Sequence, residues 1–256
     1  MTATEIFSLL GAAMAAGAIN AVAGGGTILT FPTLLAIGTP AIIANATSTV
    51  ALVIGTGGSF YGFRKHITDI REWLIRFVPV SLLGGLIGSW LLTITRNEVF
   101  SHLVPFLILF ATLLFLVQGF VAGMVKKSAT APQPVTVLWP AILFQFFVSI
   151  YGGFFGAGIG ILMLATLGFI GLTDIHRMNA LKNILGSLIN IVAAIIFIAR
   201  GLVDWPKAGV MTIGAIVGYY LGSHYSQKIP QLWVRRIVLL IGFAISAVTF
   251  SRQFRS

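Results

Sequence analysis

An apolar run that is too long for one membrane-spanning helix is the feature that most constrains the fold. It extends over residues 6–43, nearly twice the about 20 residues that a helix needs to cross the ~30 Å hydrocarbon core of a bilayer. Gly24, Gly25 and Gly26 interrupt the run. Each glycine costs a helix about 1 kcal/mol relative to alanine, so three in succession predict that one helix ends here and another begins.

The composition fits a lipid bilayer better than water. Of the 256 residues, 57% are hydrophobic and 9% are charged, and the mean hydropathy is +1.00. A soluble domain carries about 25% charged residues, and one core of this size could not bury so much apolar surface. The sequence therefore predicts an all-α integral membrane protein. No basic residue precedes the first apolar run, which favours a retained span at residues 6–23 over a signal peptide.

The same order of segments occurs twice along the chain. Gly156, Gly158 and Gly160 interrupt a second long run, residues 137–172, as the glycine triplet interrupts the first. The full-length spans that follow the two runs are expected at residues 44–63, 74–95, 99–123, 178–199, 206–226 and 233–250. We interpret residues 1–125 and 137–256 as homologous repeats joined by a linker at 126–136. Each repeat would hold two short glycine-broken segments and three full transmembrane helices.

The relative orientation of the repeats depends on how the short segments enter the membrane. If both cross, or both dip in and return, each repeat crosses an odd number of times and the repeats are inverted. If each pair of short segments makes a single crossing, the repeats are parallel. The distribution of Lys and Arg favours the inverted arrangement by a small margin.

Two further glycine pairs have the spacing of helix-packing motifs. Gly84 and Gly88 lie four residues apart in the first repeat, as Gly214 and Gly218 do in the second. Small residues at this spacing let two helix backbones approach closely within a membrane. We therefore expect these glycines to pack helices together rather than to bind a ligand.

The charged residues exclude several classes of function. The net charge is +10, but the 16 basic residues lie in short clusters between apolar runs, where they indicate topology rather than nucleic-acid binding. The six acidic residues lie in tails, loops or span ends, which argues against a cation carrier, a carboxylate proton relay or a hydrolase. The chain has no cysteine and no phosphate-binding P-loop sequence. We expect no enzyme, no catalytic residue, no metal and no cofactor.

The two glycine interruptions are candidate anion sites. Broken backbone at membrane depth requires surrounding protein or a water-filled cavity, and the helix that begins after a break offers N–H groups and a positive dipole end. Matching breaks could direct two helix N-termini at one central site. The predicted substrate-binding residues at the breaks are Gly24, Gly25, Gly26, Thr27, Gly156, Gly158 and Gly160. Close packing through small residues is the alternative.

Polar residues at the start of the third segment of each repeat extend the candidate site. They are Asn45, Thr47, Ser48, Asn179, Lys182 and Asn183. Their side chains can donate hydrogen bonds to sulfonate-type oxygens, and lysine adds a positive charge. The alternative is helix capping by Asn45 and Asn179 and extension of Lys182 to the interface. We assign Asn20, Gln145, Tyr151 and Asn190 to contacts between helices.

Four stretches of sequence resemble the TauE/SafE sulfite-exporter family. They are GAINAVAGGGTI at residues 17–28, ANATS at 44–48, GFFGAGIG at 153–160 and RMNALKN at 177–183. The likeness extends over about residues 6–250. It implies a bacterial inner-membrane permease for sulfite, sulfonates or related sulfur anions.

These features together lead to one functional expectation. The protein would be a secondary transporter for a small sulfur-containing anion, with the two repeats enclosing a midplane cavity and one half rocking against the other. Its partners would be the anion and the lipid bilayer, without nucleic acid, and the sequence leaves open whether a homo-oligomer forms. A transporter for a carboxylate and an anion channel remain the alternatives.

Overall fold

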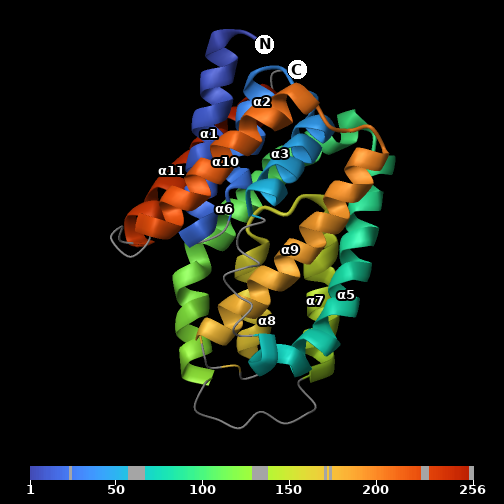
Figure 1. Cartoon of the computed structure of the whole chain (residues 1–256), viewed down its shortest axis with the longest axis vertical. Coiled ribbons are helices and arrows are strands. Elements are labelled where there is room, and N and C mark those ends of the chain that lie inside the picture. The colour runs from blue at the N-terminus through green and yellow to red at the C-terminus, as the bar shows by residue number, and fades with distance from the viewer. Residues whose placement is uncertain are drawn as a thin grey trace.

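The computed structural model describes residues 1–22, 25–56, 67–128, 138–169, 172, 175–225 and 231–253. Within these residues every regular element is an α-helix (Figure 1). The helices of the N-terminal half are α1 (Ala3–Val22), α2 (Thr27–Ala36), α3 (Ala41–Thr56), α5 (Ile67–Ile94) and α6 (Asn97–Ser128). Those of the C-terminal half are α7 (Leu138–Phe154), α8 (Ile159–Phe169), α9 (Ile175–Ala199), α10 (Trp205–Tyr225) and α11 (Gln231–Gln253).

The helices are long and apolar enough for a membrane. Within the described ranges, α1, α5, α6 and α9 each contain a segment that meets the length and hydropathy of a membrane span. Large apolar side chains such as Phe7, Phe120, Tyr220 and Leu240 are more than two thirds exposed on the outside of the bundle. Lipid is the environment in which such a surface is stable.

The helix ends coincide with the predicted glycine interruptions. α1 ends at Val22, Gly25 has φ +95°, and α2 begins two residues later. In the second interruption, Gly156 and Gly158 have φ +79° and +75°, and α8 begins at the next residue. Backbone with positive φ strains any residue that has a β-carbon, so glycine is the residue that lets the chain reverse here.

One predicted length differs from the structure. The first arm, expected to be short, is the 20-residue α1, whereas α2 has 10 residues and α8 has 11. These two helices are about 15 Å long, roughly half of the ~30 Å hydrocarbon core. α2 stops because Gly38, with φ +82°, turns the backbone and lets the Gly38 and Thr39 N–H groups donate to carbonyls of its last turn.

The other boundaries lie close to the predicted ones. α3 runs from Ala41 to Thr56, and residues 57–63 of the predicted span lie outside the described part of the chain. α5 begins seven residues before the predicted residue 74, and α6 continues to Ser128, within the predicted linker. The remainder of that linker also lies outside the described residues.

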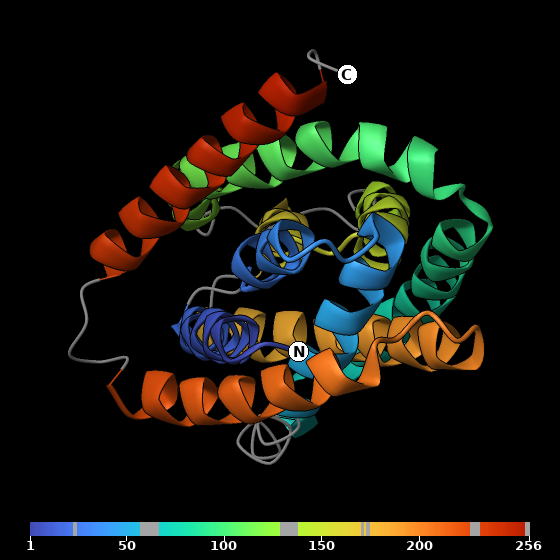
Figure 2. The ribbon, with the colours of Figure 1, turned by 90° about the horizontal axis from the view of Figure 1, so that it is seen from above.

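Two helix hairpins form the centre of the molecule. Figure 1 shows α1 and α2 in its upper part and α7 and α8 in its lower part, so that the two hairpins enter from opposite ends. Seen from above, α5, α6, α10 and α11 form a frame around them (Figure 2). The glycine turns of both hairpins therefore lie in the interior of the bundle.

Glycines join the hairpins to helices of the opposite half of the chain. α1 packs along α10, and α7 packs along α5. A β-carbon at Gly218 would lie 1.9 Å from the carbonyl oxygen of Met14, and one at Gly88 would lie 2.0 Å from that of Ile150. The helices can approach this closely only where the β-carbon is missing. The packing role predicted for these glycines is confirmed.

Candidate functional site

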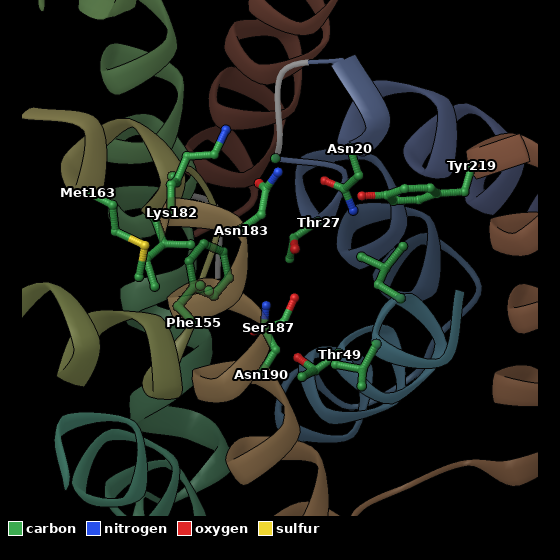
Figure 3. Close-up of a pocket in the computed structure, with 17 residues that line it drawn as sticks. Asn20, Thr27, Thr49, Phe155, Met163, Lys182, Asn183, Ser187, Asn190 and Tyr219 are labelled. Carbon is green, nitrogen blue, oxygen red and sulfur yellow. The ribbon is translucent and has the colours of Figure 1, made fainter. Parts of the chain in front are cut away.

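A cavity of about 120 Å³ lies where the two glycine interruptions meet (Figure 3). One wall comes from the α1–α2 hairpin, α3 and α10, and the other comes from the α7–α8 hairpin and α9. The first wall is lined by Asn20, Gly25, Thr27, Thr49, Leu52, Val53 and Tyr219. The second is lined by Phe155, Gly156, Ile159, Gly160, Met163, Lys182, Asn183, Gly186, Ser187 and Asn190.

Two helix N-termini border this cavity. Thr27 is the first residue of α2, and Gly160 is the second residue of α8. The N–H groups of Ile28, Leu29, Ile159 and Ile161 donate to glycine carbonyls of the two turns, so the donors that each helix start can offer to a ligand are the N–H groups of Thr27 and Gly160. A small anion between these two residues would accept hydrogen bonds from both hairpins.

Side chains hold the two turns in shape. The Gly26 N–H donates a 2.7 Å hydrogen bond to Oδ1 of Asn20, which ties the end of α1 to the start of α2. In the other hairpin, the Tyr151 hydroxyl donates a 2.7 Å hydrogen bond to the carbonyl oxygen of Ala157. Both turns are thus positioned before any ligand arrives, which lowers the entropic cost of binding.

Lys182 brings the positive charge to the cavity. Its side chain lies along the start of α8, where a β-carbon at Gly160 would come within 3.3 Å of its Cδ. In the described part of the chain, no carboxylate lines the cavity and Lys182 has no ion-pair partner. A lysine ammonium away from water is costly unless an anion or polar groups compensate it.

One face of α9 supplies most of the polar groups on this wall. Lys182, Asn183, Gly186, Ser187 and Asn190 are spaced so that they lie on one side of a helix. Figure 3 shows Lys182 and Asn183 opposite Asn20 and Tyr219, with the cavity between them. Polar side chains therefore reach the same space from α1, α9 and α10.

Six of the predicted site residues line the cavity. They are Gly25, Thr27, Gly156, Gly160, Lys182 and Asn183. Of the others, Gly24 lies outside the described residues. Three more do not line the cavity, although Gly26 and Gly158 directly precede α2 and α8 and Asn179 lies in α9.

The polar cluster of α3 has other partners in the structure. Nδ2 of Asn45 donates a 3.1 Å hydrogen bond to the carbonyl oxygen of Phe154, and Oγ1 of Thr47 accepts a 3.0 Å hydrogen bond from the Asp204 N–H. The Ser48 hydroxyl lies 2.6 Å from that of Thr30. These side chains join helices, because the face of α3 that meets the cavity is the one that carries Thr49.

Several lining residues were not predicted. Asn20 and Asn190, which the sequence assigned to helix contacts, line the cavity, whereas Gln145 does join helices by donating to the Ser81 hydroxyl. Ser187 and Asn190 could have been found from the sequence, since they follow Asn183 at intervals of four and seven residues. No sequence signal marks Tyr219, because α10 is distant in the chain from the glycine interruptions.

A bundle of apolar helices with a large exposed apolar surface defines the class of multi-pass membrane proteins, and here a cavity lined by polar side chains and a lysine lies between the helices. Residues 9–249 match the family described as sulfite exporter TauE/SafE. The chain belongs to this family, as its glycine and asparagine motifs indicated.

Similar proteins have names of the same class. A probable membrane transporter protein of Haemophilus influenzae is 29% identical over 232 residues, covering 90% of this chain and 88% of the relative. The probable membrane transporter protein ORF9 of a Sinorhizobium species is 28% identical over 243 residues, which cover 92% of this chain and 88% of the relative. The probable membrane transporter protein YfcA of Escherichia coli K12 is 26% identical over 238 residues, which cover 92% of this chain and 86% of the relative. No solved structure matches the chain.

The family and these relatives identify the chain as a membrane transporter of the TauE/SafE type. The family is a class of transporters and not a class of enzymes.

Proposed function

We propose that the protein is a secondary transporter that moves a small sulfur-containing anion across the bacterial inner membrane by alternating access. The observation that carries this proposal is the position of Lys182, a cation without an ion-pair partner among the described residues, in a cavity between two interrupted helix hairpins. An ionisable group inside a membrane protein is costly to place there, and such groups mark substrate and ion pathways.

The donors around the cavity favour an anion over a cation. Lys182 offers three N–H donors, Asn183 and Asn190 add amide groups, and the starts of α2 and α8 add backbone N–H groups. Carboxylate ligands, which a transported cation would need, are missing from the described lining residues.

A sulfur oxyanion fits this arrangement better than a carboxylate. A sulfite or sulfonate group carries three oxygens that point in different directions, whereas the two oxygens of a carboxylate lie in one plane. Donors reach the cavity from both walls, from Asn20 and Thr27 on one side and from Lys182 and Asn183 on the other. The description of the family as sulfite exporters agrees with this reasoning.

The packing of the helices suggests which parts move. α10 contacts α1 and α3, so these helices and α2 form one body, which we call the first body. α5 contacts α7 and α9, and together with α8 they form the second body. Each body thus takes one helix from the opposite half of the chain, while α6 and α11 pack against each other.

Hydrogen bonds reinforce each body. In the first, Nζ of Lys207 on α10 donates a 3.0 Å bond to Oγ1 of Thr39, which lies between α2 and α3. In the second, Nε2 of Gln145 on α7 donates a 3.1 Å bond to the Ser81 hydroxyl on α5. These contacts and the glycine packing join the helices within each body, whereas the hydrogen bond from Asn45 to Phe154 joins the two bodies and would have to break when they move apart.

One wall of the cavity belongs to each body. A rocking motion of the first body against the second would open the cavity first to one side of the membrane and then to the other. This mechanism replaces the expectation that residues 1–125 rock against residues 137–256, because the hairpins pack on helices of the opposite half. Inverted repeats remain part of the proposal. The α1–α2 hairpin of the first body and the α7–α8 hairpin of the second enter from opposite ends, so the two hairpins would play equivalent roles.

A disulfide between α5 and α9 distinguishes motion of the two bodies from motion of the two sequence halves. A β-carbon at Gly85 would lie 3.5 Å from Cβ of Ile189, a separation that suits a disulfide, and the chain has no cysteine of its own. We expect oxidised Gly85→Cys/Ile189→Cys to retain most of its exchange rate in proteoliposomes, because both residues lie in the second body. If the sequence halves moved, the bridge would join two moving parts and stop exchange. The single-cysteine variants under the same oxidant are the controls.

Counterflow in proteoliposomes tests the transport function itself. Vesicles with purified protein are preloaded with unlabelled sulfite, and the uptake of radiolabelled sulfite is measured, with short sulfonates and monocarboxylates as competitors. We expect transient, saturable accumulation that sulfonates inhibit and acetate does not. Uptake that rises in proportion to concentration without saturating would indicate a channel. Inhibition by acetate but not by sulfonates would indicate a carboxylate transporter.

A further inference from the structure

We propose, on the basis of the transport function proposed above, that the cavity selects anions with a single negative charge and discriminates against dianions of the same size. The charge balance of the described lining residues carries this inference. Lys182 contributes one positive charge, and no second cation and no carboxylate line the cavity within the described residues.

The helix ends add little net charge to this balance. A helix N-terminus is equivalent to about half a positive charge and a C-terminus to about half a negative charge. At the first interruption the C-terminal end of α1 lies beside the N-terminal end of α2, and at the second α7 ends where α8 begins. The opposite partial charges at each turn largely cancel, so that the helix ends offer hydrogen-bond donors without a full second charge.

Lys182 therefore sets the charge that a bound anion can neutralise. The Lys182 side chain packs against the start of α8, because Gly160 has no β-carbon and leaves room for Cδ of Lys182. A monoanion beside it completes an ion pair. A dianion would carry a second charge into a site of low dielectric constant, where an uncompensated charge is strongly unfavourable.

The remaining polar groups do not replace a second cation. Asn20, Asn183 and Asn190 carry amides, and Thr49 and Ser187 carry hydroxyls, so each can orient an oxygen without neutralising it. Figure 3 shows these groups around the cavity on both sides. They suit a head group with several oxygens and one net charge, such as a sulfonate or hydrogen sulfite.

Two matched pairs of competitors test the inference on the wild-type protein. The first pair is methanesulfonate, a monoanion, and sulfate, a dianion of similar size. The second pair is isethionate, a monoanion, and sulfoacetate, which is a dianion at neutral pH. In counterflow of radiolabelled sulfite, we expect each monoanion to compete at least about tenfold more strongly than its dianionic partner. Equal competition, or stronger competition by the dianions, would overturn the inference while leaving transport intact. If no labelled sulfite exchanges at all, the transport function fails and the inference fails with it.

A second cation in the cavity gives a complementary test. Asn183→Lys would raise the charge of the lining residues by one, and we expect it to shift the ratio of competition towards sulfoacetate and sulfate. An unchanged ratio in a folded variant that exchanges sulfite would contradict the charge-matching argument. Should the variant not fold, the comparison of competitors on the wild-type protein still decides the question.

Discussion

Lys182→Met is expected to weaken the apparent affinity for the transported anion by about 30-fold or more. Methionine keeps much of the length and apolar character of the lysine chain but removes the only charge among the described lining residues. Truncating one partner of a buried charge pair costs about 2–5 kcal/mol, and each 1.4 kcal/mol is a factor of ten in affinity. The measurement is the concentration of sulfite that gives half-maximal counterflow.

Arg200→Met is the matched control for this substitution. Arg200 is exposed and directly follows the last residue of α9, so its replacement removes the same charge beside the same helix without touching the cavity. We expect it to leave the half-maximal concentration unchanged. If both variants behave alike, or if Lys182→Met transports like the wild type, Lys182 does not bind the anion.

Gly88→Val is expected to lower the stability of the protein by about 3 kcal/mol or more, at the upper end of the cost of overpacking a core. A β-carbon at position 88 would lie 2.0 Å from the carbonyl oxygen and 2.8 Å from the carbonyl carbon of Ile150. Since both are backbone atoms, no change of rotamer can relieve the clash, and α5 must move away from α7. The measurement is thermal unfolding of the purified protein in detergent.

The same substitution at Gly209 provides the control. Gly209 lies in α10, and a β-carbon there would meet no atom within 4 Å. Gly209→Val should therefore unfold close to the wild-type temperature, with only the small effect of a β-branched residue in a helix. Similar unfolding temperatures for the two variants would show that α5 and α7 are not packed as closely as described.

The helix interruptions could be predicted from the sequence because their cause is local. Several glycines close together are unfavourable for a helix, so the clusters that contain Gly25, Gly156 and Gly158 indicate the turns without knowledge of the tertiary structure. The length of the first arm was not predicted, because apolar composition alone does not show where a helix begins. Its start at Ala3 includes polar residues of the N-terminus.

The candidate site could be predicted only in part. Lys182 and Asn183 were found because a charge and an amide are conspicuous in an apolar run. Asn45, Thr47 and Ser48 have similar chemistry and lie in the matching segment of the first half, yet they form hydrogen bonds with α7, with Asp204 just before α10 and with α2. Which face of α3 meets the cavity depends on tertiary packing, and this packing directs Thr49 to the cavity instead.

The division into moving bodies could not be predicted from the sequence. The glycines Gly84, Gly88, Gly214 and Gly218 indicated close packing of α5 and α10 but not the partner helix. The structure pairs each of them with a hairpin of the opposite half. The order of the sequence therefore suggested that each half of the chain forms one moving body. The helix contacts instead favour bodies in which each half contributes one helix, α5 or α10, to the body of the other half.

Locating a bound anion tests the central claim most directly. Selenite is a close analogue of sulfite, and its selenium atom can be identified by anomalous diffraction from crystals of the protein. We expect one strong peak between the starts of α2 and α8, within hydrogen-bond distance of Nζ of Lys182, and no such peak in Lys182→Met crystals. A selenium peak elsewhere in a transporting protein, with the cavity between the hairpins empty, would contradict the account.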